Sequence, residues 1–404
     1  MASIEIKNIG PLVDTGKIEL KFINLFIGKQ STGKRTLMKI LSFCCWLEKK
    51  IMTEGEEKLS QYTHYLRFKR ELIQFHRLND NFFSVASEIH YEGDCVTIDL
   101  VGGKANAKIK RSPDFKSKRY NTKLSFIPSE RNLLSAIKNI DRAYKSNELD
   151  SMFNFLFEWG EAKDYYTAEK PFRLSVVSNM EYYYDKEKGS DIIYLEEPKK
   201  EFSTYYASSG VQSALPIEVM VDYLIGLIGK SKKVSVSDIS RLSDLFNVDS
   251  NINTIQTVAK QLLSYHSIKL FIEEPEQNLY PESQRKLVLK VIASIYRTSR
   301  SGDKPSMITF TTHSPYILST LNTLMAASLS YEKDAEATKA VLAEDGYEDS
   351  ILPKGSISAY LIKEDGTLQD IVDSDLQMVS GNELDSVSDW VDDRIAKFNE
   401  IIYG

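Results

Sequence analysis

Gly28, Gly33 and Lys34 have the residue types and the spacing of a phosphate-binding loop, G-x-x-x-x-G-K. Glycines let the backbone turn its N–H groups towards a phosphate, and the lysine neutralises the β- and γ-phosphates of a nucleotide. The pattern is weak on its own, because glycine and lysine are common residues. A largely apolar run over 22–27 precedes the loop and an apolar helical stretch follows it, which predicts strand, loop and helix in that order. The sequence therefore favours a nucleotide site over a plain glycine-rich turn.

Two other predicted strands end in side chains that suit phosphate chemistry. Glu273 and Glu274 end the apolar run over 268–272, and His313 follows the run over 306–312. Ligands bind at the carboxyl ends of strands in open α/β sheets. The first carboxylate can hold a Mg²⁺-bound water, and the second can polarise the water that attacks a γ-phosphate. Taken singly, the carboxylate pair would be a charged strand end and the histidine a structural residue. A functional interpretation therefore requires that they lie at the same edge of one sheet.

Ser208, Ser209 and Gly210 precede an apolar helix. Their N–H groups and hydroxyls would lie at a helix start, which is a place for an anion. Alone, this segment is an ordinary helix N-cap. Its functional meaning comes from the other three segments.

With these four segments in this order, the chain resembles the ABC-type ATPases of the RecF, SMC and OLD class. The phrases FIEEPEQNLYP and TFTTHSPYIL are especially similar to the OLD-type members. The likeness runs from Ile4 to about Asn322, and FIPSERNLL stands where the family has its Q-loop. The resemblance implies ATP and Mg²⁺ as cofactors.

The resemblance also implies a role for each segment. Cofactor-binding residues would be Gly28, Lys29, Gln30, Ser31, Thr32, Gly33, Lys34, Arg35 and Thr36 in the Walker A loop, and Ser208, Ser209 and Gly210 within the signature, Ala207 to Val211. Glu273 and Thr36 would be the metal ligands, Glu274 the catalytic base and His313 the switch histidine. The Q-loop segment contains Ser129 and Glu130 but no glutamine, and Walker B has glutamate where aspartate is commoner.

Arg35 is the clearest departure from the family pattern. A serine or threonine usually follows the lysine and ligates Mg²⁺. Here Thr36 comes one position late, and on a helix it points about 100° away from position 35. A guanidinium beside Mg²⁺ is also repulsive. We therefore expect a chain that binds ATP well and hydrolyses it slowly.

The family's heads hydrolyse ATP at a dimer interface, so the resemblance implies a head-to-head dimer or larger assembly with composite sites. The stretch between Thr36 and Ala207 is too short for long coiled-coil arms, and no Toprim domain follows His313. A stand-alone head of this kind resembles the ATPase subunits of two-gene bacterial defence systems such as Septu and PARIS. This implies an antiviral function and a separate HNH or Toprim nuclease partner. The alternative is a RecF-like or SMC-like DNA-binding protein for repair.

The alternative depends on a basic run from Lys104 to Lys123, which contains one acidic residue, Asp114. Such a run can face nucleic-acid phosphates, although most are solvated loops. Asp370, Asp373 and Asp375 suggest a metal-dependent nuclease site less well, because no repeated βα pattern surrounds them.

The predicted fold class is α/β, a P-loop ABC-ATPase head with a mixed, largely parallel core sheet, an N-terminal antiparallel β-subdomain and a helical insertion. Residues 1–330 would form the head, in which 57–205 hold the β-subdomain, the basic loop and a helical and hairpin insertion. Residues 331–404 would be an acidic C-terminal extension packed on the head. Strands are expected over 3–9, 17–27, 82–90, 95–101 and 123–127, helices over 57–78, 146–166 and 283–297, and a hairpin over 171–197.

Composition agrees with a globular chain that functions in the cytoplasm. The 404 residues carry a net charge of -6 and are 42% hydrophobic, which supports a sizeable core and argues against a protein that coats nucleic acid over its whole surface. The three cysteines show no C-x-x-C spacing, so neither a disulfide framework nor a zinc ribbon is expected. The sequence MASIEIKNIG lacks a signal h-region, and no apolar run approaches the length of a membrane span.

Overall fold

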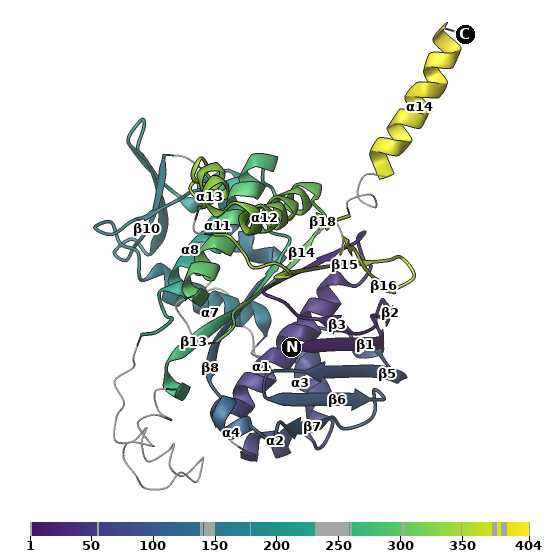
Figure 1. The fold of residues 1–404 in the computed structure, drawn as a ribbon. Coiled ribbons are helices and arrows are strands. Elements are labelled where there is room, and N and C mark those ends of the chain that lie inside the picture. The colour runs from purple at the N-terminus through teal and green to yellow at the C-terminus, as the bar shows by residue number, and fades with distance from the viewer. Residues whose placement is uncertain are drawn as a thin grey trace.

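A six-stranded sheet lies at the centre of the chain, with the strand order β16-β15-β4-β14-β13-β8 (Figure 1). In the computed structural model its strands are β16 (Leu368–Asp370), β15 (Ile357–Ile362), β4 (Ile23–Ile27), β14 (Met307–Thr312), β13 (Tyr265–Glu273) and β8 (Asn121–Ile127). β16 is antiparallel to β15, and the other neighbours are parallel. The described residues are 2–403 without 55, 138–139, 141–149, 178, 231–257, 259–260, 301–303, 349, 374–377 and 381–385.

The central strands are buried on both faces. Every residue of β4, β14 and β15 is buried, as expected for parallel strands whose crossover connections cover the sheet. Successive side chains therefore enter two different cores. Ile272 and Phe310 belong to one, whereas Phe26 and Phe271 belong to the other.

Helix α1 (Lys34–Glu54) lies between the central sheet and a second, antiparallel sheet. Its apolar residues share one core with Phe26 and Phe271 of the central sheet and with Ile6 and Ile98 of the antiparallel sheet. The second sheet has the order β2-β1-β5-β6-β7, with β3 beside β1. Its strands and nearby helices are β1 (Ser3–Ile9), β2 (Leu12–Asp14), β3 (Ile18–Glu19), β5 (Phe83–Glu92), β6 (Val96–Val101), β7 (Lys108–Arg111), α2 (Glu56–Tyr62), α3 (Arg67–His76), η1 (Asp80–Phe82) and α4 (Phe115–Lys118).

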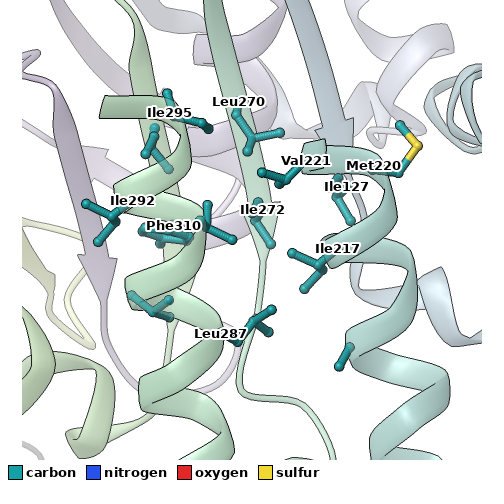
Figure 2. Packing of buried hydrophobic residues seen from close by; sticks show 14 of the residues in the cluster. Ile127, Ile217, Met220, Val221, Leu270, Ile272, Leu287, Ile292, Ile295 and Phe310 are labelled. Atoms are coloured by element: carbon teal, nitrogen blue, oxygen red, sulfur yellow. The ribbon is translucent and has the colours of Figure 1, made fainter. Parts of the chain in front are cut away.

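A layer of helices covers the opposite face of the central sheet. Figure 2 shows Ile217 of α8 (Ser209–Ile225) and Ile292 of α11 (Pro281–Arg300) beside Ile272 and Phe310 of the strands. Burial of such side chains contributes about 1.5–3 kcal/mol each. The remaining helices on this side of the chain are η2 (Ser129–Asn132), α5 (Leu133–Ala136), α7 (Ser151–Lys163), η3 (Thr204–Tyr206), α12 (Pro315–Lys333) and α13 (Ala335–Ala343).

A four-stranded antiparallel sheet is inserted between α7 and α8. Its strands are β9 (Phe172–Arg173), β10 (Met180–Asp185), β11 (Ser190–Leu195) and β12 (Lys200–Ser203). β10 and β11 form the predicted hairpin. The buried carboxylate of Glu218 on α8 fixes the insertion, because it accepts hydrogen bonds from the backbone N–H groups of Ser175 and Val176 and pairs with Lys290.

Two predicted elements are divided by local backbone geometry. The strand expected over 17–27 is split into β3 and β4, because the Asn24 side chain accepts a hydrogen bond from the Lys21 N–H and fixes a turn. The helix expected over 57–78 is divided into α2 and α3, since Tyr65 and Leu66 have φ of 52° and 55°, which no α-helix accommodates. The helix expected over 146–166 begins partly outside the described residues, and α7 starts at Ser151.

The C-terminal region contributes to the central sheet itself. β15 pairs with β4 in parallel, from Ile357 beside Ile23 to Leu361 beside Ile27. The sequence predicts an extension packed on the rest of the chain over 331–404, whereas β15 and β16 form part of the central sheet. The chain ends with β17 (Val372–Asp373), β18 (Met378–Val379) and α14 (Ser386–Tyr403). In Figure 1, α14 projects away from the rest of the chain, and its described side chains over 391–399 are exposed.

No helix within the described ranges combines the length and apolar character needed to cross a bilayer. All three cysteines are buried and free.

Candidate functional site

Three of the four predicted segments meet at the carboxyl edge of the central sheet. Glu273, at the end of β13, lies beside Thr311 of β14, and Thr312 lies beside Ile27 of β4. The phosphate loop follows Ile27, and His313 follows Thr312. The sheet register therefore brings the glycine-rich loop, the carboxylate pair and the histidine to one edge.

The glycines of the loop occupy positions where a larger residue would not fit. Gly28 has φ of 149°, and a Cβ there would lie 2.5 Å from the backbone oxygen of Ile362. Gly33 has φ of 111°, and a Cβ there would lie 2.7 Å from Cδ2 of Leu12. Both conformations are rarely open to residues with a Cβ. The spacing of the two glycines is thus required by the shape of the loop.

Lys34 opens α1 and turns back over the loop. Its Nζ donates hydrogen bonds to the backbone oxygens of Gly28, at 2.7 Å, and Lys29, at 2.6 Å. Lys34 is only 5% exposed, and burial lowers the pKa of its ammonium to about 8. Thr32 and Thr36 are buried, whereas Lys29, Gln30 and Ser31 are exposed. The buried ammonium is placed where an incoming phosphate would meet it.

Arg35 pairs with Glu274, the predicted catalytic base, and with Glu273, a predicted metal ligand. Its Nη2 lies 3.0 Å from Oε1 of Glu274, and its Nε lies 3.8 Å from Oε2 of Glu273. Partial burial alone would lower the pKa of Arg35, but Glu273 and Glu274 raise it. The guanidinium therefore stays charged and pairs with both carboxylates.

The two carboxylates have different surroundings. Glu273 is 1% exposed; its Oε2 accepts a hydrogen bond from the Ser129 N–H at 3.1 Å, and burial raises its pKa. Oε1 of Glu273 is buried without a hydrogen-bond partner among the described residues. Glu274 has φ of 44° and is held by its N–H bond to the Thr311 oxygen. Strained backbone of this kind is typical of functional sites.

His313 lies beside Glu274, with its Nε2 3.8 Å from Oε1 of that carboxylate. Burial, and then the charge of Lys34, lower the pKa of His313, so its imidazole is neutral at pH 7. Its backbone N–H donates to Oε1 of Glu276 at 2.7 Å. Burial raises the pKa of Glu276. Sequence reasoning missed Glu276 although it stands inside the same EEPEQ segment.

Arg131 is a second residue that sequence reasoning missed. Its buried guanidinium donates to the backbone oxygens of Glu273 at 2.7 Å, Glu274 at 2.8 Å and Ser213 at 2.9 Å. Burial lowers its pKa to about 10. Arg131 thereby fixes the end of β13 to α8. The only signal for it was its place in the predicted Q-loop segment, next to Glu130.

Ser208, Ser209 and Gly210 begin α8 at the surface. The Ser208 side chain accepts the N–H of Val211 at 3.4 Å, and both serines are exposed. A Cβ on Gly210 would lie 3.1 Å from the backbone oxygen of Asn278. This segment therefore borders the loop that follows Glu274, and its hydroxyls face outwards.

The residues at this edge do not fit Mg²⁺. Oε1 of Glu273 is the oxygen that a metal would meet, but the positively charged Arg35 guanidinium already lies within 3.8 Å of this carboxylate and 3.0 Å of Glu274. Thr36 is one position too late to ligate beside Lys34. The described residues contain no group of three or more histidine, cysteine, aspartate or glutamate side chains that could hold a metal ion. This statement covers Asp370 and Asp373, whereas Asp375 lies outside the described residues.

No family model and no curated protein sequence matches the chain. Among solved structures, the chain is similar to the SMC head domain from Thermotoga maritima, with 9% identity and a TM-score of 0.34. It is also similar to an SmcHead bound to the C-winged helix domain of ScpA, with 10% identity and a TM-score of 0.35. Each similarity covers 79% of this chain and 90% of the other. These scores are too low to transfer a residue role or an activity.

Proposed function

We propose that the chain binds ATP at the carboxyl edge of the central sheet and hydrolyses it slowly, as an ABC-type ATPase head. One observation supports this above the others: the Lys34 ammonium, on a glycine-rich loop between a strand and a helix, shares that edge with Glu274 and His313. Backbone N–H groups at the start of α1 and Lys34 would hold the phosphates. Glu274 would polarise the attacking water, and neutral His313 would hydrogen-bond beside it.

Binding of ATP tests the first half of this proposal. Lys34→Met should weaken ATP binding by about tenfold or more, because a charge-assisted contact to phosphate is lost. Lys397→Met on α14 serves as the matched control, since this exposed lysine pairs with Asp393 outside the site and should leave affinity nearly unchanged. Equal affinity of wild type and Lys34→Met would contradict the proposal.

Hydrolysis tests the second half. Phosphate release by wild type should be slow and should disappear in Glu274→Gln while ATP still binds. Arg35→Ser should raise turnover, because it frees Glu274 from its ion pair and restores the usual residue after the lysine. If wild type hydrolyses ATP briskly and Arg35→Ser changes nothing, the role given to Arg35 is wrong. A protein that binds ATP without any turnover would instead be a structural nucleotide-binding subunit.

A composite site between two heads agrees with the exposure of Ser208 and Ser209 at the start of α8. In this arrangement the signature of one copy caps the γ-phosphate held by the other, and ATP favours the closed dimer. Gel filtration of Glu274→Gln with ATP should then show a larger species. A monomer both with and without ATP would rule out the composite site.

The biological setting that we propose is a prokaryotic antiviral defence complex in which this subunit controls a separate HNH or Toprim nuclease. Support for this step comes from the family resemblance of the motifs and not from the geometry. Purification from the native host tests it directly. Recovery of the chain without any nuclease would argue against it.

A RecF-like DNA-binding protein is the second candidate. The basic run is not one loop but spans β7, α4 and the start of β8, and Lys104, Lys108, Lys110 and Lys116 are exposed. Lys123 does not contribute, because it is buried and pairs with Glu158 at 2.9 Å. Duplex binding that weakens with salt and is lost in Lys108→Glu/Lys110→Glu would favour this candidate.

A further inference from the structure

We propose that Arg35 supplies the positive charge that a divalent metal ion supplies at most nucleotide sites, so that this chain binds the triphosphate of ATP without Mg²⁺. This inference rests on the proposed function, since it concerns the same site. It concerns whether ATP binding requires Mg²⁺, which can be measured separately from whether ATP binds at all.

The position of the guanidinium carries the inference. Arg35 lies in the first turn of α1, directly after Lys34, and contacts Glu274 at 3.0 Å and Glu273 at 3.8 Å. A metal held by these carboxylates would have to displace the guanidinium or lie beside it. Two cations a few ångströms apart repel strongly in a partly buried site. The arginine and the metal are therefore alternatives.

The protein oxygens that could ligate a metal are also few. Mg²⁺ takes most of its octahedral ligands from water and nucleotide phosphates, but one or two protein oxygens usually fix its position. Oε2 of Glu273 already accepts the Ser129 N–H and faces Arg35. The segment from Ser129 to Asn132 offers no glutamine. Position 35 thus lacks the hydroxyl that usually ligates Mg²⁺, and few other oxygens at the site can replace it.

The Arg35 guanidinium can serve as a counter-ion for a phosphate group. It carries five N–H donors, and its contacts to Glu273 and Glu274 use two of its nitrogens, Nε and Nη2. The side chain is 46% exposed, so its free donors can be reached by a ligand. Guanidinium groups bind phosphate in a bidentate manner and remain charged at all physiological pH values. Arg35 and Lys34 together present two adjacent cations at the N-terminus of a long helix.

Equilibrium dialysis of radiolabelled ATP against the full-length chain, in excess Mg²⁺ and in EDTA, tests the inference. The dissociation constant of wild type should agree within about threefold between the two buffers. Arg35→Ser should bind at least about tenfold more weakly in EDTA than in Mg²⁺, because its site then depends on the metal. Arg35→Gln should behave in the same way, and it provides a second uncharged variant if the serine variant does not fold.

A matched control removes an arginine elsewhere. Arg285→Ser on α11 loses an exposed pair with Asp345 and should remain insensitive to EDTA. A loss of about tenfold or more for wild type in EDTA would overturn the inference while leaving ATP binding established. Insensitivity of both Arg35 variants to EDTA would also overturn it. If wild type binds no ATP in either buffer, the proposed function is itself wrong and the inference falls with it.

Discussion

Burial sets the charge state of the side chains around the phosphate loop. The pKa values of Lys34 and His313 are lowered, and those of Glu273 and Glu276 are raised. Burial is the largest cause of all four shifts, and each shift favours the neutral form. A polyanionic ligand would reverse this for Lys34, because its phosphates favour the charged ammonium. Binding of such a ligand should therefore favour the protonated form of Lys34.

Lys34 gives ATP binding a defined pH dependence. In the free protein the ammonium is charged below its pKa of about 8 and loses its proton above it. Since only the charged form attracts phosphate, affinity should be highest below pH 8 and fall by about tenfold by pH 9. Titration calorimetry at several pH values measures this change. Lys34→Arg stays charged and should show a flat profile, whereas a flat profile for wild type would refute the assignment.

Arg131 should matter for stability more than any exposed arginine. Arg131→Met removes the buried guanidinium that donates to the backbone oxygens of Glu273, Glu274 and Ser213. The free energy of unfolding should fall by about 3 kcal/mol or more. Chemical denaturation measures it. Arg173→Met removes an exposed pair with Glu196 and should change the free energy of unfolding by less than about 1 kcal/mol. A similarly small loss for Arg131→Met would contradict the role of Arg131 in fixing β13 to α8.

Sequence periodicity predicted the elements that bury apolar side chains on a simple repeat. Apolar runs predicted β4, β13 and β14. The spacing of glycines and lysine predicted the loop between β4 and α1, and the β10–β11 hairpin could also be predicted. Their register could not, and register is what brings Glu273 beside Thr311. Arg131 and Glu276 escaped prediction because their contacts depend on long-range packing. The residue roles inferred from the family pattern remain predictions.

A buried ion cluster joins α1 to both sheets. Lys269 of β13 lies 3.5 Å from Glu48 of α1 and 3.3 Å from Asp94, which follows β5. Glu48 also accepts the N–H groups of Cys95 and Val96. The cluster therefore positions the helix that carries Lys34 relative to the strand that carries the carboxylates.

Removal of Lys269 alone should destabilise the protein. Lys269→Met leaves the Glu48 carboxylate buried and uncompensated, so the free energy of unfolding should fall by about 3–5 kcal/mol. Lys269→Met/Glu48→Gln should lose less than the single variant, since the fully buried charge of Glu48 is gone and only the less buried Asp94 has lost its lysine. Urea denaturation of both variants gives the coupling. Additive losses would show that the two residues do not interact.

At the scale of the whole molecule, the region after residue 331 serves two different structural purposes. β15 lies beside β4 in the central sheet, whereas α14 projects from the body with exposed side chains over 391–399. An antiparallel sheet, a central sheet and a helical layer enclose two cores. Both cores contain residues of β15. The region after 331 therefore contributes one part to these cores and another part to a projecting helix.

Truncation distinguishes these two parts. Deletion of 386–404 should leave the melting temperature within about 2 °C of wild type, because exposed residues contribute little to stability. Deletion of 357–404 removes β15 and β16, the two strands on one side of β4, and should abolish cooperative unfolding in circular dichroism. A large loss of stability from the shorter deletion would show that α14 packs on the body in solution.

The pairing of β15 with β4 also bears on how the chain is made. β15, whose Ile362 oxygen borders Gly28, is synthesised long after β4. The glycine-rich loop of a nascent polypeptide therefore lies on an unfinished sheet until β15 has been added. A fragment that stops before β15 lacks the strand that borders this loop, so it should not hold the loop in its finished shape.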